Sequence, residues 1–218
     1  MRKSMTTAAY EQISQYIQDG VLAPGSALIE TELCERLNMS RTPIREALQR
    51  LSSEERIDYS RARGFTVSTF SSEKLGHVYE ILEGLEGMMS YLLAEDHSSP
   101  SFADAGAAVA EMEAASEQEN WNEWLKADTK FHRAMYESCR NVYIARYAER
   151  FNRPASQVRT MITRFHLDKK KSTSDHKELY EAIVRGEAER ARTVAENHYR
   201  WIRGEVLKYL EALNIPGG

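Results

Sequence analysis

The sequence predicts a mainly α-helical chain of two domains, residues 1–70 and residues 75–218, joined by a short linker at 71–74. Two observations support this prediction. The only short alternating segments typical of strands lie before residue 70, and apolar residues recur at helical spacing through most of the remaining chain. With 11 Gly and 5 Pro in 218 residues, the composition is that of a globular protein.

Three predicted helices open the chain, each with an apolar stripe. The first runs for about 14 residues and ends at Gly20, which supplies a C-terminal cap. The second spans Glu30–Leu37. The third follows Ser40, an N-cap residue, and has Pro43 in its first turn. Its apolar stripe consists of Ile44, Ala47, Leu48 and Leu51.

Two alternating stretches come next, at 57–60 and 65–69, on either side of a basic turn at 61–64. They predict a β-hairpin with an arginine-rich tip. Helix, helix, helix and hairpin is the order of a winged helix-turn-helix. We therefore expect residues 1–70 to form such a DNA-binding domain.

From residue 72 onward the pattern is helical, with polar or Pro/Gly-containing breaks and no strand signal. The expected helices span 73–96, 102–119, 121–139, 141–167, 175–186 and 187–212, and the stretch 168–174 is expected to be a polar break. These elements predict an all-α antiparallel bundle.

Several classes of protein are excluded at this stage. No apolar segment approaches the roughly 20 residues that span a bilayer, and the residues after Met1 lack the apolar core of a secretory signal. We expect a cytoplasmic protein without a membrane partner. Cys34 and Cys139 have no metal-type or disulfide-type spacing, so we expect both to be reduced packing residues.

The formal net charge is -4, from 29 basic and 33 acidic residues, but the charge is uneven. Residues 36–63 contain seven arginines and four acids. Such a patch can bind phosphates on an acidic protein, because salt screens the distant charges beyond about 8 Å. The same run also fits a solvated helix face, so charge alone leaves both interpretations open.

Two motifs resemble a known family. Gly25-Ser-Ala-Leu-Ile-Glu-Thr-Glu-Leu33 and Ser40-Arg-Thr-Pro-Ile-Arg-Glu-Ala-Leu48 are similar to the DNA-binding signature of GntR-family transcription regulators. The bundle, with Asp128-Thr-Lys-Phe-His132, His176 and His198, resembles the ligand-binding domain of the FadR (FCD) branch. The resemblance implies a repressor that binds a double-stranded DNA operator as a homodimer and responds to a small-molecule effector.

The resemblance also implies which residues contact DNA. Arg41 and Arg45 would contact bases or adjacent phosphates, the hydroxyl of Ser40 or Thr42 a phosphate, and Gly64 the minor groove. We also expect Arg50 to contact a phosphate. An arginine that binds guanine bidentately contributes about 1–3 kcal/mol of discrimination. Where the family has Gly-Leu after this helix, the chain has Glu55-Arg56, so the turn into the wing is expected to differ.

Three histidines and one aspartate are predicted to point into the bundle. Asp128 and His132 are four residues apart on one helix face, and His176 and His198 lie on apolar stripes of later helices. A lone inward histidine is more often a packing residue than a ligand. The resemblance implies instead that these four residues bind a divalent metal ion, of which Zn, Ni, Mn and Fe all suit the donor set.

The predicted effector pocket is formed by Tyr79, Leu82, Arg159 and Arg164. Leu82 stands where the family has an arginine that binds an effector carboxylate. We therefore expect an effector that is less acidic or bulkier than a small hydroxy or keto acid, or one held chiefly through the metal. Arg159 and Arg164 are the candidate replacement cations.

Two other functions remain open from the sequence. A DNA-binding architectural protein with a purely structural metal would have the same motifs and no effector. A metal-dependent hydrolase could use three histidines and an aspartate to activate water. The second leaves the DNA-binding half unexplained and lacks a dedicated general base, so we expect no enzyme activity.

Overall fold

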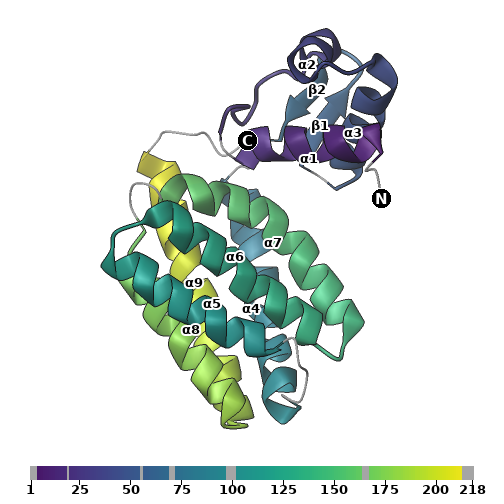
Figure 1. Cartoon of the computed structure of the whole chain (residues 1–218). Helices are drawn as coiled ribbons and strands as arrows, with labels where there is room; N and C mark the ends of the chain where they lie inside the picture. The colour runs from purple at the N-terminus through teal and green to yellow at the C-terminus, as the bar shows by residue number, and fades with distance from the viewer. Residues whose placement is uncertain are drawn as a thin grey trace. The chain divides into compact units, whose positions relative to one another are not determined.

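The computed structural model describes residues 4–18, 20–54, 56–68, 72–96, 102–163 and 167–212. The chain divides into two compact units, Met1–Phe70 and Ser71–Gly218. The first contains the elements α1 (Met5–Gln18), α2 (Glu30–Leu37), α3 (Arg41–Ser53), β1 (Ile57–Ser60) and β2 (Gly64–Val67) (Figure 1). This order confirms the predicted winged helix-turn-helix.

The core of the first unit lies between α1 and α3, which pack together along their apolar stripes. Beside them β1 and β2 pair in antiparallel register, from Ile57 with Val67 to Ser60 with Gly64. Gly64 has a φ of 68°, which only glycine adopts readily. The segment before α2 extends this hairpin, because the amide of Gly25 donates to the Val67 carbonyl at 2.8 Å. The sequence pattern did not predict that third strand-like segment.

Arg56, the residue directly before β1, is buried and only 5% exposed. Its Nη1 donates to the Ser14 hydroxyl at 2.7 Å and its Nη2 to the Ser14 carbonyl at 3.3 Å. The guanidinium therefore ties the start of β1 to α1. Counting Arg56 in the basic surface patch was wrong, because its charge is used inside the domain.

In the described part of the second unit, the helices run alongside one another (Figure 1). They are α4 (Ser72–Glu95), α5 (Ala103–Glu117), α6 (Trp121–Ser138), α7 (Val142–Thr163), α8 (Lys169–Val184) and α9 (Ala188–Ala212). The predicted bundle is thus confirmed. Trp124 and Phe131 of α6 are fully buried at its centre. Within the described ranges, no helix combines the length and apolar character needed to cross a bilayer.

The start of α8 differs from the prediction. The sequence favoured a polar break over 168–174, but α8 begins at Lys169. Asp168 caps the helix by accepting from the Lys171 amide at 3.0 Å. Ser172 and Thr173 are buried, and the Trp124 indole donates to the Thr173 hydroxyl at 2.8 Å. The buried face of this first part of α8 is therefore polar. Without an apolar stripe, the sequence pattern did not indicate a helix here.

Candidate functional site

The N-terminal end of α3 presents polar side chains to solvent. Arg41, Thr42 and Arg45 are exposed, whereas Ile44 and Leu48 on the other face are fully buried. Arg45 Nε lies 3.8 Å from Glu30 Oε1 of α2, a long and largely exposed ion pair. Such a pair contributes little stability, so Arg45 can leave Glu30 at small cost.

Ser40 occupies the N-cap position of α3 in extended geometry, but its side chain makes no capping hydrogen bond. An N-cap hydroxyl normally accepts from the amide of the second or third helical residue. The third residue here is Pro43, which has no N–H to donate. The exposed Ser40 hydroxyl is therefore left out of the helix cap.

Arg50 differs from the other predicted DNA contacts because its guanidinium is already engaged. The group lies 3.8 Å from the centre of the Tyr10 ring, and its Nε is 3.2 Å from Glu54 Oε1. The Tyr10 hydroxyl also donates to Glu54 at 2.5 Å. A phosphate contact by Arg50 would compete with these interactions. At Gly64 an added Cβ would meet nothing within 4 Å, so this glycine is needed for its backbone conformation.

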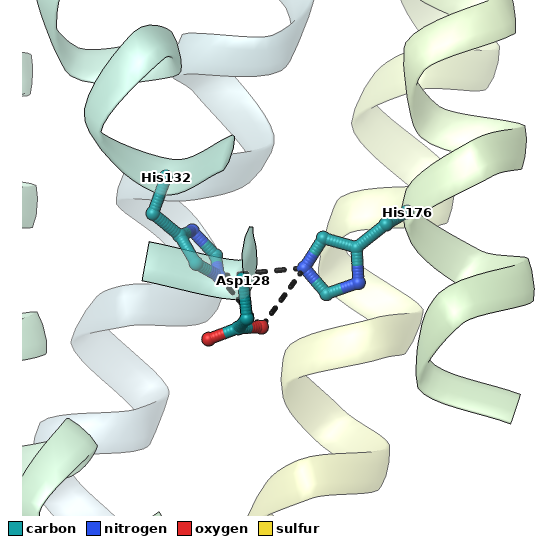
Figure 2. Close-up of side chains that lie close together, drawn as sticks. All are labelled: Asp128, His132 and His176. Atoms are coloured by element: carbon teal, nitrogen blue, oxygen red, sulfur yellow. Dashed lines mark hydrogen bonds and ion pairs between the residues drawn. The ribbon is translucent and has the colours of Figure 1, made fainter. Parts of the chain in front are cut away.

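A cluster of ionisable side chains lies inside the bundle, formed by Asp128 and His132 of α6 and His176 of α8. Figure 2 shows the three pointing toward one another. His176 Nε2 lies 3.4 Å from His132 Nε2 and 3.5 Å from Asp128 Oδ1, and His132 Nε2 lies 3.9 Å from the same oxygen. Each residue is at most 5% exposed. The four-residue spacing of Asp128 and His132 places both on one face of α6, as the sequence predicted.

Hydrogen bonding fixes which nitrogen of His176 faces the cluster. Its Nδ1 lies 2.7 Å from the Ser172 carbonyl, which only accepts, so Nδ1 carries the proton. In the neutral ring Nε2 then presents a lone pair toward the Asp128 carboxylate oxygen. Two electron-pair donors at this distance need a cation between them, which a proton on Nε2 or a metal ion would provide.

The donor set fits a divalent transition metal. Ligand atoms about 2.0–2.2 Å from a tetrahedral ion lie about 3.4 Å from one another, close to the separations of 3.4 to 3.9 Å here. The donor atoms of Asp128, His132 and His176 all lie within 4.8 Å of one another. Imidazole and carboxylate ligands suit several such ions, so the donor set alone does not choose among them.

His198, the fourth predicted ligand, lies on α9 next to this cluster but is not part of it. Its ring centre is 4.7 Å from that of His176, and the residue is 5% exposed. Its Nδ1 is held by Asp175 Oδ2 of α8 at 3.0 Å. The structure therefore brings three of the four predicted ligands together and places His198 beside them.

Asp175 was not among the site residues that the sequence pattern predicted. Burial raises the pKa of this carboxyl, but the hydrogen bonds and charge interactions with His198 and Lys171 together lower it by more, so its pKa lies below the usual value. The Lys171 ammonium lies 2.6 Å from Asp175 Oδ2. The signal that could have identified Asp175 is its position directly before His176, four residues after a lysine.

Glu86 of α4 is a buried carboxylate that the sequence pattern also did not predict. Its Oε1 accepts from the Tyr136 hydroxyl of α6 at 2.8 Å and the Tyr199 hydroxyl of α9 at 2.9 Å. Both phenol rings lie beside His132, with ring centres 6.3 Å away. The Asn152 amide of α7 donates to the Tyr136 hydroxyl. Side chains of α4, α6 and α9 therefore meet at one carboxylate next to the cluster, and α7 is joined to them through Tyr136.

The predicted effector-pocket residues are placed only in part. Tyr79 and Leu82 are fully buried in α4, and the Tyr79 hydroxyl donates to the Ala155 carbonyl at 3.4 Å. The side chain of Arg159 and the whole of Arg164 lie outside the described residues. Among the described side chains of the bundle, no lysine or arginine is buried.

Comparison with known proteins agrees with both halves of this description. Residues 77–200 match the FCD domain, more than half of the chain, and residues 5–67 match bacterial regulatory proteins of the gntR family. The chain belongs to the GntR family and has an FCD domain. It is a transcriptional regulator, and the hydrolase alternative is excluded because the relatives it matches are regulators.

Two relatives illustrate the range of similarity. An uncharacterized HTH-type transcriptional regulator of Agrobacterium vitis, from the TAR-I ttuE-ttuC' intergenic region, is 32% identical over 133 residues, which cover 59% of this chain and 77% of that protein. The gluconate operon transcriptional repressor of Bacillus subtilis is 27% identical over 136 residues, covering 62% and 55%.

Among solved structures, Escherichia coli McbR/YncC has a TM-score of 0.81 at 21% identity, covering 95% of this chain and 99% of that one. A GntR regulator from Rhodococcus sp. RHA1 has a TM-score of 0.78 at 22% identity, covering 94% and 99%. At these identities the similarity shows the shared fold.

Proposed function

We propose that this GntR regulator is a metabolite-responsive repressor that binds a pseudo-palindromic DNA operator in the cytoplasm as a homodimer. The observation that supports this most directly is the exposed end of α3, with Arg41, Thr42 and Arg45 in solvent and a Ser40 hydroxyl that its own helix does not use. Recognition helices of this class place such residues in the major groove, and hydroxyls there hold phosphates.

The DNA proposal is tested with operator fragments selected from genomic DNA by the wild-type protein. Arg45→Ala and Arg41→Ala should each weaken specific binding by about 1–3 kcal/mol and relax base preference. Arg133→Ala on α6 removes the same charge from an exposed ion pair and should leave operator affinity unchanged. Unchanged footprints and affinities for both α3 variants would overturn the assignment.

Two exposed apolar faces of the bundle support the homodimer. Ile81 and Met88 lie seven residues apart on α4 and are 41% and 40% exposed. Val142 and Tyr143, at the start of α7, are 67% and 69% exposed. A two-fold dimer buries the same patch on both subunits, and one recognition helix contacts too few base pairs for specificity in a genome.

The dimer proposal is tested by light scattering. Wild-type protein should have about twice the 25.0 kDa chain mass. Changing Ile81 and Met88 together to Glu should shift the protein toward monomer. Val184→Glu, at an exposed apolar residue of α8, is the matched control and should remain dimeric. A monomeric wild-type protein, both free and on DNA, would overturn the proposal.

We also propose that Asp128, His132 and His176, together with His198, bind one divalent metal ion. When bound, the ion would supply a positive charge that joins α6, α8 and α9 and can coordinate an effector. Elemental analysis should find close to one metal ion per chain, and removing the ion with a chelator should lower the melting temperature. His132→Ala with His198→Ala should abolish binding, whereas His77→Ala on the exposed side of α4 should not.

Electrostatics inside the bundle favours an effector that either carries little negative charge or coordinates the metal itself. Glu86 and Asp128 are buried carboxylates, Leu82 is buried, and an unpaired anion beside them would cost several kcal/mol. Calorimetry of small carboxylates against metal-loaded and metal-free protein tests this. Tight binding of such an acid to metal-free protein, unchanged by Arg159→Ala and Arg164→Ala, would contradict it.

The burial of the three ligands also fits the second candidate, a structural metal without an effector. If no metabolite alters operator binding by the metal-loaded protein, while chelation unfolds the bundle, the structural role is the correct one.

A further inference from the structure

Two consecutive contacts connect the protein surface to His198. The Lys171 ammonium is 2.6 Å from Asp175 Oδ2, which is 3.0 Å from His198 Nδ1. The side chains of these residues are 43%, 20% and 6% exposed in that order. Lys171 and Asp175 both lie on α8, four residues apart, so one helix supplies the support for a histidine of α9.

This contact determines the form of the His198 ring. An ionised carboxylate only accepts hydrogen bonds, so the nitrogen facing Asp175 must be the donor. With the proton on Nδ1, the neutral ring has its lone pair on Nε2, the only nitrogen left for a metal. Histidine ligands of metals commonly have such an outer partner, which fixes the ring and makes the coordinating nitrogen more basic.

Lys171 is held in place from a second side. Its ammonium lies 4.4 Å from the centre of the Trp201 ring on α9, and that ring is 5.9 Å from the ring of His198. The lysine therefore lies between the Asp175 carboxylate and an aromatic face of the helix that carries His198. The Lys171 ammonium and the His198 Nδ1 therefore contact the same oxygen, Oδ2, of Asp175.

We infer that Asp175 is a positioning residue for His198, fixing its Nδ1–H tautomer and directing Nε2 to serve as the fourth metal ligand, and that Lys171 holds Asp175 in place. The inference depends on the proposed metal site. The donor atoms of Asp128, His132 and His176 form the cluster, and no nitrogen of His198 belongs to it. The inference gives a role to the hydrogen bond that orients the His198 ring beside that cluster.

The first test measures metal affinity by competition with a chromophoric chelator, using Zn²⁺ and Ni²⁺. Asp175→Ala should weaken binding about 10–100-fold. Asp175→Asn should weaken it less, since an amide oxygen can still accept, and Lys171→Met should have the smallest effect. The matched control is Asp168→Asn, the same substitution at the cap of the same helix, away from the histidines. Affinity of Asp175→Ala within twofold of this control would overturn the inference.

The second test needs no metal. Nitrogen-15 NMR of the histidine rings in metal-free protein should show His198 protonated at Nδ1 in the wild type and in Asp168→Asn. In Asp175→Ala the His198 signals should shift toward a mixture of tautomers. If Asp175 only joined α8 to α9, its loss would lower thermal stability without shifting the His198 signals. A wild-type His198 protonated at Nε2 would also refute the positioning role.

The two proposals fail in distinguishable ways. If His132→Ala abolishes metal binding but Asp175→Ala does not weaken it, the metal site stands and the positioning role is wrong. If the wild-type protein binds neither ion, the metal site is wrong and the inference about Asp175 falls with it.

Discussion

Replacing Arg56 with alanine should destabilise the DNA-binding unit from within. The substitution removes a charged hydrogen bond of 2.7 Å to the Ser14 hydroxyl, worth about 1.5–3 kcal/mol, and a weaker one of 3.3 Å to the Ser14 carbonyl, worth about 0.5–1 kcal/mol. The expected loss is about 2–4 kcal/mol. For a domain of this size, that corresponds to a fall in melting temperature of at least about 8 °C.

Hydrogen exchange followed peptide by peptide locates the effect, because it separates the two units. Protection should fall in α1 and β1 and remain unchanged in the bundle. Ser14→Ala, which removes only the hydroxyl, should cost less. In a double-mutant cycle, the stability losses of Arg56→Ala and Ser14→Ala should not add, because both remove the same hydrogen bond.

A direct DNA contact by Arg56 would give a different result. Its loss would weaken operator binding at unchanged stability and lower the salt dependence of binding by about one ion. An unchanged melting temperature for Arg56→Ala, together with that loss of salt dependence, would refute the structural role.

Three further predictions concern the bundle. Glu86→Ala should lower its stability by about 2–4 kcal/mol, because the hydroxyls of the half-buried Tyr136 and the buried Tyr199 lose their acceptor. Glu86→Gln should lower it by less, because an amide oxygen still accepts, and chemical denaturation measures both. Burial raises the pKa of the Cys139 thiol, so at pH 8 less of it is thiolate, and mass spectrometry should find it alkylated in folded protein far more slowly than in urea. Gly204→Ala should stabilise α9 by about 0.5–1 kcal/mol, since the added Cβ would meet nothing within 4 Å. Gly106→Ala should destabilise α5 by about 1–3 kcal/mol, since the added Cβ would lie 2.5 Å from a tyrosine hydroxyl. A reversed order of the two melting temperatures would contradict the packing described.

The sequence correctly predicted which residues of α6 face the inside of the bundle. The spacing of Asp128 and His132 predicted that both point inward with Phe131, and all three are buried. These predictions succeed because the period of a helix is a local property.

Predictions failed where the partner is distant in the sequence. Arg56 was counted as a surface charge because its partner Ser14 lies 42 residues earlier. Asp175 was overlooked because it contacts His198, 23 residues later. A periodicity argument contains no information on which side chain of another helix lies opposite, so such pairs become visible only in three dimensions.

The N-cap of α3 contributes less stability to the free protein than a serine cap usually does. A serine at the N-cap normally contributes about 1 kcal/mol, and the Ser40 hydroxyl gives none of this to its helix, because Pro43 removed one of the two amides that could donate to it. Proline in the first turn keeps that segment rigid all the same. The helix α3 is therefore held by its backbone while the hydroxyl at its end takes no part in its cap, which is the arrangement that the proposed phosphate contact requires.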